Sequence, residues 1–299
     1  MPKVSVVIPT YNRPNFLRAA VRSVLGQTFQ DFEIVIVDDA STGETQAVVA
    51  SFGDPRIRYL RHDQNRQISG ARNTGVQAAT GEFVAFLDDD DEWRREKLEK
   101  QVHILETSAS TVGVVYTAFE QVNVPSGEVV GQISPIKRGH ILHELCSRNW
   151  VGTASTVCLR RKCFDEVGLF DERMTFGEEY DMWIRVAHRY DFRYLDEVLV
   201  RYGLHRRRLS RNFDIMISGL EWQLEKHRAF FGSDPANYSR RYTSLGRLYC
   251  YNGQAQRGRR AFLRAVELAP GILKNYFYLG LAMLGAEAFT AIRGPKGLR

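Results

Sequence analysis

The stretch "FVAFLDDDDEW", residues 83–93, joins a short apolar run to four consecutive aspartates, Asp88 to Asp91. An apolar run of this length is typical of a strand buried on both faces. Four adjacent carboxylates repel one another, so they destabilise a compact fold unless something neutralises them. The stretch therefore predicts a buried strand whose carboxyl end opens onto a site that needs positive charge.

Further apolar segments alternate with helical patterns along the first hundred residues. Apolar residues recur at helical spacing after Pro14, and "SGARNTGVQAAT" (69–80) has the pattern of a helix closed by Gly81. The other expected strands are "VSVVIP" (4–9), "FEIVIV" (32–37) and "IRYLR" (57–61). Alternating strands and helices predict an α/β fold, with a mostly parallel sheet covered by helices on both faces.

Polar residues follow three of these strands where each strand ends: "PTYN", "DDAS" and the aspartate run. Ligands of open α/β sheets bind outside the carboxyl ends of the strands, where these residues would meet. Such an acidic edge suits a divalent cation held by oxygen ligands, with a diphosphate on its other side. Asp39, apart from the run, is placed to accept N–H groups from a nucleobase. Helix capping is the alternative for "DDAS", but it does not explain four aspartates.

The composition is that of a soluble globular protein: 299 residues, 44% hydrophobic and 25% charged. A strand-like "KVSVVIP" starts the chain, so no signal peptide is expected. The cysteines (Cys146, Cys158, Cys163, Cys250) lack metal-type spacing and are expected to be reduced thiols in a cytosolic protein. Residues 201–299 hold 18 Lys and Arg against 6 Asp and Glu. This excess indicates either a solvated basic face or contact with a membrane surface, nucleic acid or a phosphorylated substrate.

The chain resembles family 2 glycosyltransferases, inverting enzymes with a GT-A fold. The matching segments are "VSVVIPTYNRPNFLRAAVRSVLGQTFQDFEIVIVDDAST", "GARNTGVQAATGEFVAFLDDDDEW" and "VGLFDERMTFGEEYDMWIR", in the family's order and roughly its spacing. The resemblance covers about residues 3–210. It implies a Rossmann-like GT-A domain with a nucleotide-binding half and an acceptor-binding half.

The resemblance also implies the residues of the donor site. The nucleotide contacts would be Pro9, Thr10, Tyr11, Asp39, Arg72, Asp88 and Asp89. The metal, Mn²⁺ or Mg²⁺, would be held by Asp88, Asp90 and His205, with Asp91 as a spare acid. His205 is otherwise a surface residue in a basic loop. The arginines that follow it (Arg206, Arg207, Arg208 and Arg211) would close over the diphosphate, or face solvent or lipid headgroups.

On the acceptor side, "TASTVCLR" (153–160) is expected to form a strand beneath the acceptor. In "GEEYDMWIR", Glu179 takes the position of the family's catalytic aspartate, one methylene longer, and would act as general base. Asp181 is the alternative base. No QxxRW-type motif follows, which in this family indicates a single addition in place of processive synthesis. UDP is the nucleotide that the resemblance favours, with GDP and dTDP left open.

The last third has a different pattern. "YTSLGRLYCYNGQAQRGRRAFLRAVELAP" (242–270) matches a tetratricopeptide repeat, and Tyr276, Leu279 and Gly280 begin another. We therefore expect a catalytic domain over 1–212, divided near residue 110, and a helical region over 213–299 with one repeat over 242–275. Residues 276–292 would form a packed helical hairpin or an interfacial membrane helix.

The expected function is metal-dependent, inverting transfer of a sugar from a nucleotide-diphosphate sugar to a saccharide or lipid-linked acceptor. The setting would be bacterial surface polysaccharide or glycolipid synthesis, in the cytoplasm and peripherally at the inner face of the membrane. The basic C-terminal region would contact an anionic membrane surface or a protein partner, and no nucleic acid. Two alternatives stay open: a catalytically degenerate transferase domain that presents the repeat as a scaffold, and a nucleotidyltransferase.

Overall fold

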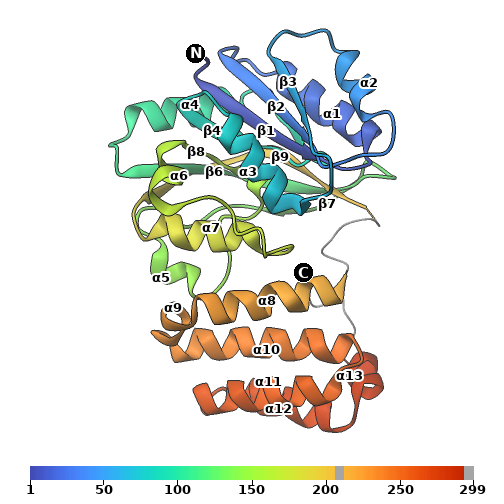
Figure 1. The fold of residues 1–299 in the computed structure, drawn as a ribbon. Helices are drawn as coiled ribbons and strands as arrows, with labels where there is room; N and C mark the ends of the chain where they lie inside the picture. The colour runs from blue at the N-terminus through green and yellow to red at the C-terminus, as the bar shows by residue number, and fades with distance from the viewer. Residues whose placement is uncertain (206–211, 293–299) are drawn as a thin grey trace. The chain divides into compact units, whose positions relative to one another are not determined.

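The computed structural model describes residues 1–205 and 212–292, which fall into two units (Figure 1). The first unit comprises Met1–Leu142 and Asn149–His205. The second comprises His143–Arg148 and the described part of Arg206–Arg299. Each unit has a buried core of its own, and the aspartate run belongs to the first.

The first unit is built on one nine-stranded sheet in the order β3-β2-β1-β4-β8-β6-β9-β5, with β7 paired to β6. Its strands are β1 (Val4–Thr10), β2 (Phe32–Asp38), β3 (Ile57–Arg61), β4 (Phe83–Phe86), β5 (Glu92–Trp93), β6 (Val112–Asn123), β7 (Val129–Ile133), β8 (Cys158–Arg160) and β9 (Asp191–Leu204). The strands β3, β2, β1 and β4 are parallel, as is the pair β6 and β9, and the other pairings are antiparallel. The predicted α/β class is confirmed, and its parallel arrangement is concentrated in the N-terminal four strands.

The helices, in chain order, are α1 (Pro14–Leu25), α2 (Thr45–Ala50), α3 (Gln67–Ala78), α4 (Lys97–Thr107), α5 (Leu142–Leu145), α6 (Lys162–Val167), α7 (Glu178–Ala187), α8 (Phe213–Lys226), α9 (Arg228–Gly232), α10 (Pro235–Tyr251), α11 (Ala255–Leu268), α12 (Leu273–Met283) and α13 (Ala286–Ile292). A short 3₁₀ helix occupies Ala154–Thr156. The expected helices after Pro14 and over 69–80 correspond to α1 and α3, but α3 ends at Ala78 with Ala79 as its C-cap, so the expected closure by Gly81 is wrong.

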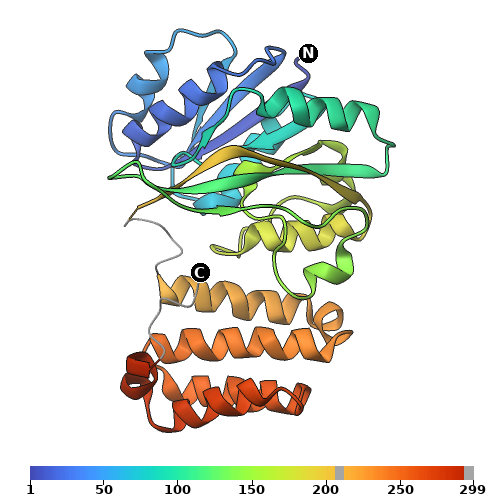
Figure 2. The ribbon, with the colours of Figure 1, turned by 180° about the vertical axis from the view of Figure 1, so that it is seen from behind.

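Side-chain alternation explains why helices cover both faces of the parallel strands (Figures 1 and 2). Val4, Val6 and Ile8 of β1 point to one face, where they share a core with apolar residues of α1 and α4. Val35 and Val37 of β2 point to the other face, toward α3. Both faces are therefore apolar, which is why these strands are continuous hydrophobic runs.

Helix α3 lies unusually close to the sheet. A Cβ atom on Gly75 would lie 2.2 Å from Cγ1 of Val7, a distance that no side chain tolerates. Gly75 therefore lets α3 approach β1, which brings the start of this helix to the edge where the parallel strands end.

The second unit consists of helices held by aromatic packing. The Phe262 ring of α11 stacks on Tyr278 of α12, with 5.7 Å between centroids, and on Phe289 of α13 at 5.9 Å. A buried polar contact adds to this: Thr243 Oγ1 donates to Asn275 Oδ1 over 2.8 Å. The expected C-terminal helical region is confirmed, while its assignment as a tetratricopeptide-like repeat stays a prediction.

None of the helices within the described residues has both the length and the apolar composition needed to cross a membrane.

Candidate active site

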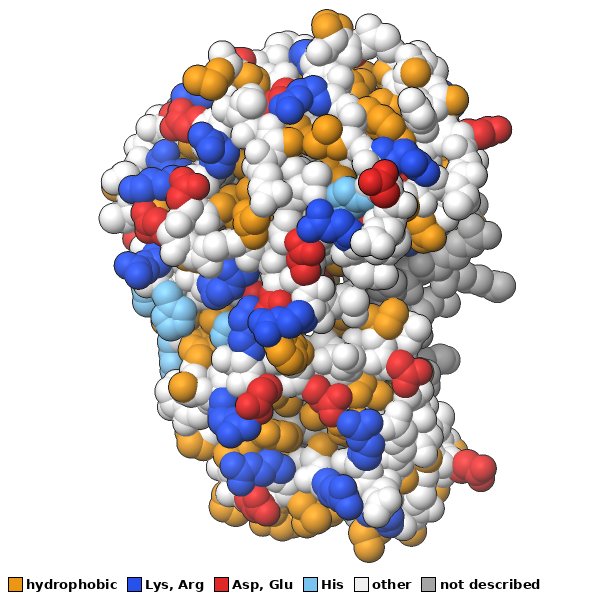
Figure 3. All heavy atoms as spheres, in the orientation of Figure 1, with side chains coloured by type: hydrophobic (Ala, Val, Ile, Leu, Met, Phe, Trp, Pro, Cys, Tyr) orange, Lys and Arg blue, Asp and Glu red, His pale blue; other side chains and the backbone are white. Residues whose placement is uncertain are grey.

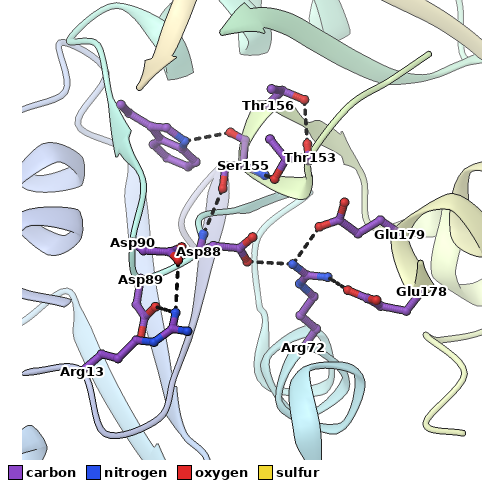
Figure 4. Close-up of polar contacts among 11 residues, drawn as sticks. Arg13, Arg72, Asp88, Asp89, Asp90, Thr153, Ser155, Thr156, Glu178 and Glu179 are labelled. Atoms are coloured by element: carbon purple, nitrogen blue, oxygen red, sulfur yellow. Dashed lines mark hydrogen bonds and ion pairs between the residues drawn. The ribbon is translucent and has the colours of Figure 1, made fainter. Parts of the chain in front are cut away.

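The four aspartates follow β4, and Figure 4 shows that the side chains of Asp88, Asp89 and Asp90 enter different surroundings. The backbone N–H of Asp88 donates to Ser155 Oγ over 3.0 Å. Thr10 Oγ1, at the end of β1, donates to Asp89 Oδ2 over 2.7 Å. The polar residues that follow β1 and β4 thus meet at one edge of the sheet because the two strands are parallel neighbours.

Asp90 lies between a guanidinium and an imidazole. Nη1 of Arg13 is 3.0 Å from Asp89 Oδ1 and 3.2 Å from Asp90 Oδ2. Nε2 of His205 is 2.7 Å from the same oxygen of Asp90, and its ring stacks on Phe16 with 4.9 Å between centroids. Arg13 therefore neutralises part of the run. His205, which directly follows β9, contacts the run through Asp90.

The two other acids on this side are deeply buried. Burial and the charge of Asp90 raise the pKa of Asp89 to about 7, against the opposing effect of Arg13. Burial, with repulsion from Asp90 and Asp88, raises the pKa of Asp91 well above its usual range. Asp91 Oδ1 accepts the backbone N–H of Gly203 over 2.9 Å, and within the described residues its Oδ2 has no hydrogen-bond partner. Asp91 thus ties the run to β9.

Arg72 of α3 neutralises the other side of the run. Its Nη2 lies 2.7 Å from Asp88 Oδ1 and 2.9 Å from Glu179 Oε1, and its Nη1 lies 2.6 Å from Glu178 Oε1. The side chain is only 1% exposed. Burial opposes the charge, but the charges of Asp88, Glu179 and Glu178 outweigh it and raise the pKa of Arg72. Arg72 thus joins the aspartate run to α7, and its expected contact with the nucleotide stays a prediction.

Glu179 stands in the first turn of α7, which begins after Gly177 in a left-handed conformation (φ 76°). Met182, Trp183 and Val186 are fully buried and anchor this helix. Burial raises the pKa of Glu179 to about 8; Arg72 opposes the shift, and the charges of Glu178 and Asp88 reinforce it. The carboxyl is therefore rigidly held and titrates near neutral pH.

Asp181, the alternative base, has a different environment. Its side chain is fully buried, and its Oδ2 accepts Nε and Nη2 of Arg185 over 3.0 and 2.9 Å. Arg185 also donates to the carbonyl oxygens of Val167 and Leu169, so the ion pair fixes α7 to the preceding loop.

The expected nucleotide residues lie at the ends of β1 and β2. Pro9 and Thr10 are buried, whereas Tyr11 is 47% exposed. Asp39 Oδ1 accepts the backbone N–H of Arg66 over 2.7 Å and lies 2.7 Å from His62 Nδ1. Asp39 is thus oriented before any ligand binds.

The expected strand over 153–160 is wrong for its first half. Thr153 Oγ1 accepts the N–H of Ser155 and starts the 3₁₀ helix, so the strand begins only at Cys158. This turn, of the kind that hydroxyl side chains favour, delivers Ser155 to Asp88.

Sequence reasoning therefore missed Ser155, and it missed Arg13 and His62. Arg13 and His62 could have been identified from the sequence, because Arg13 follows the polar residues "PTYN" at the end of β1 and His62 directly follows β3. The expected roles of Arg206, Arg207, Arg208 and Arg211 lie outside the described residues.

The side chains of the aspartate run and its neighbours are suited in part to hold a hard divalent cation. Carboxylate oxygens and an imidazole suit Mn²⁺ or Mg²⁺, and Asp90 with His205 forms such a pair. Asp88, the third expected ligand, is held by Arg72. Across residues 1–205 and 212–292, no three His, Cys, Asp or Glu side chains converge as a ready-made metal site.

Comparisons with known proteins agree with this architecture. Solved structures similar to the chain include S. aureus TarS 1–349 in complex with UDP-GlcNAc (18% identity, TM-score 0.66, 97% of this chain and 90% of that one). Another is the mannosyltransferase PcManGT from Pyrobaculum calidifontis in complex with GDP-Man and Mn²⁺ (16% identity, TM-score 0.60, 100% and 88%). At these identities the likeness shows the fold, which is the expected GT-A fold.

Sequence relatives are closer. An uncharacterized glycosyltransferase of Rickettsia felis is 30% identical over 216 residues, 70% of this chain, but the match spans only 35% of that relative's length. The Escherichia coli protein WfgD, named as a UDP-Glc:alpha-D-GlcNAc-diphosphoundecaprenol beta-1,3-glucosyltransferase, is 32% identical over 184 residues, 61% of this chain and 69% of WfgD. The family model "Glycosyl transferase family 2" matches residues 5–168, more than half of the chain. The chain therefore belongs to glycosyl transferase family 2.

Proposed function

We propose that the chain is a metal-dependent, inverting glycosyltransferase that transfers one sugar from a UDP-sugar to an acceptor hydroxyl. The observation that carries the proposal is Arg72, whose Nη2 contacts both Asp88 of the aspartate run and Glu179 of α7. One buried cation thus keeps a donor-side carboxylate and an acceptor-side carboxylate at a fixed, short separation. This supports departure of the leaving group and removal of a proton within one site.

Glu179 is the general base of this mechanism. The acceptor oxygen attacks the anomeric carbon opposite the diphosphate; its bond to carbon forms as the bond to the diphosphate oxygen breaks. The acceptor proton passes to a Glu179 oxygen, a transfer typically worth about 10²–10⁴-fold in rate. A single displacement inverts the anomeric configuration and needs no covalent sugar intermediate. The ion pair of Asp181 with Arg185 favours Glu179 over Asp181 in this role.

The nucleotide lies over the ends of β1 and β2. The orientation of Asp39 by His62 and Arg66 supports recognition of nucleobase N–H groups through its second oxygen. The exposed Tyr11 ring next to the buried Pro9 and Thr10 supports stacking on the base. UDP is favoured by the name of WfgD and by the UDP-GlcNAc bound to TarS; PcManGT, which binds GDP-Man, makes GDP the second nucleotide to test.

Asp90 and His205 would hold the divalent cation, with Asp88 and Asp89 on the nucleotide side. When bound, Mn²⁺ or Mg²⁺ neutralises charge on the departing diphosphate. Arg72 keeps Asp88 oriented, and Asp91 fixes the end of β9 that carries His205. The Mn²⁺ bound to PcManGT supports metal use in this fold.

The acceptor is a saccharide or a lipid-linked saccharide, as the diphosphoundecaprenol in the name of WfgD suggests.

We assign 1–212 to catalysis, with the halves dividing near residue 110, and 213–299 to a helical region with one tetratricopeptide-like repeat over 242–275. Leu273, Met283 and Leu284 of this region are 80%, 63% and 67% exposed. In Figure 3, drawn in the orientation of Figure 1, basic and acidic side chains lie among apolar ones over the C-terminal helices. These features support peripheral association with an anionic membrane surface at the cytoplasmic face.

The test is a screen of nucleotide sugars with purified protein and Mn²⁺, measuring release of free nucleoside diphosphate with and without a chelator. We expect UDP release from one or a few UDP-sugars, abolished by the chelator and strongly reduced in Glu179→Gln. Release that persists without metal, or the absence of release from every donor and acceptor tried, would contradict the proposal.

A further inference from the structure

We propose that Arg13 is a built-in substitute for the divalent cation. Its Nη1 holds Asp89 and Asp90 together in the metal-free protein; the arriving metal displaces it, and the freed guanidinium pairs with the donor diphosphate. The proposal deepens the proposed function of the same site and rests on it.

The geometry of Nη1 is that of a bridging cation. This one nitrogen contacts carboxylate oxygens of two successive aspartates, 3.0 Å from Asp89 Oδ1 and 3.2 Å from Asp90 Oδ2. The second oxygen is the one that also lies 2.7 Å from His205 Nε2. A metal ion held by Asp90 and His205 would compete with Nη1 for Asp90 Oδ2. The metal ion and the guanidinium are both positively charged, so they would repel each other strongly at such a short distance.

Arg13 can leave, whereas the other arginine of the site cannot. The Arg13 side chain is 25% exposed, and the Arg72 side chain is 1% exposed among three carboxylates. The backbone of Arg13 is fixed at the start of α1, where its carbonyl accepts the N–H of Leu17 over 3.0 Å. Release is therefore a side-chain rotation from a fixed anchor, which keeps the guanidinium within reach of a ligand bound at the aspartates.

Two consequences follow for binding. Metal alone must compete with Arg13, so it binds weakly and leaves the displaced guanidinium without its two carboxylates. A nucleoside diphosphate supplies a new anionic partner for Arg13, and arginine matches phosphate oxygens well. Metal and nucleotide therefore bind cooperatively, and by linkage each raises the affinity for the other by the same factor.

The experiment measures Mn²⁺ binding to the full chain by the electron paramagnetic resonance signal of the free ion, without nucleotide and with saturating UDP. The variants are Arg13→Gln and, as the matched control, Arg18→Gln, which changes a partly exposed arginine of α1 that donates to Ser51 Oγ. We expect Arg13→Gln to bind Mn²⁺ alone at least about tenfold more tightly than the wild type. The gain in Mn²⁺ affinity that UDP produces should shrink by a similar factor, while Arg18→Gln behaves as the wild type.

Equal or weaker binding of Mn²⁺ alone by Arg13→Gln would overturn the substitute-cation role, and an unchanged effect of UDP would overturn the diphosphate pairing. If Arg13→Gln fails to fold, Arg13→Met removes the same charge and carries the same expectations. The measurement of Mn²⁺ binding without UDP involves no nucleotide sugar and no turnover. Its result therefore does not depend on the proposed reaction. Failure of UDP to bind the wild type would count against the proposed function instead.

Discussion

Replacing Glu179 by glutamine removes the group whose ionisation should control the rate between pH 6 and 9. With a pKa of about 8 in the free protein, only about a tenth of the molecules carry the ionised base at pH 7. We therefore expect kcat/KM of the wild type to rise about tenfold from pH 6 to 7 and about fivefold from pH 7 to 8, and then to level off, because kcat/KM reports the free enzyme.

The assay follows UDP release at constant free Mn²⁺ across this pH range. Glu179→Gln should lose about 10²–10⁴-fold in kcat/KM and lose the part of the rise centred near pH 8, leaving only the ionisation of Asp89, whose pKa is about 7, while it retains metal-dependent UDP binding. The matched control is Glu178→Gln, which changes the neighbouring buried acid on Arg72. Because the charge of Glu178 raises the pKa of Glu179, this variant should keep the rise but move it to lower pH.

A stability measurement tests the same carboxyl without turnover. The pKa of Glu179 is raised from 4.5 to about 8 on folding. Between these values the native state binds more protons than the unfolded state, so this group lowers stability as pH rises from about 5 to 8. The Tm of Glu179→Gln relative to that of the wild type should therefore increase over this range.

Two results would refute this reasoning. Glu179→Gln that transfers sugar at the wild-type rate with the same pH profile would exclude Glu179 as the base. Asp181→Asn that is folded but inactive, alongside an active Glu179→Gln, would assign the base to Asp181.

Three further outcomes are expected. Asp90→Asn should weaken Mn²⁺-dependent UDP binding by at least about 100-fold in calorimetry, because the site loses an anionic ligand; unchanged affinity would refute the metal assignment. Arg72→Met leaves Asp88, Glu178 and Glu179 without their shared cation and should cost about 3–5 kcal/mol in urea unfolding at about pH 9, where Glu179 is ionised; a loss below about 1 kcal/mol at that pH would refute the shared-cation role of Arg72. The basic C-terminal third should float with anionic liposomes and be released by salt; equal recovery with neutral vesicles, or unchanged binding in a Leu273→Gln, Leu284→Gln double variant, would argue against membrane association.

The parallel strands could be predicted from the sequence because their signal is local. The runs of β1, β2 and β4 are short and apolar, whereas "IRYLR" of β3 gives a weaker signal, and β1 and β2 end at the polar residues Thr10 and Asp38. The strand expected over 153–160 failed for the opposite reason, since the hydroxyl of Thr153 offers the backbone a turn that an apolar pattern does not reveal.

The sequence by itself determined the order of the elements, the edge at which the strands end and the acids that lie there, since these depend on periodicity and on parallel pairing. Only the tertiary structure decided what neutralises each acid. Arg72 lies on α3 and meets Glu179 more than a hundred residues later in the chain. Arg13, at the start of α1, takes Asp89 and Asp90, and His205 arrives at Asp90 from the end of β9. These pairings depend on where each helix and strand lies in the folded domain, and the spacing of residues along the chain does not determine those positions.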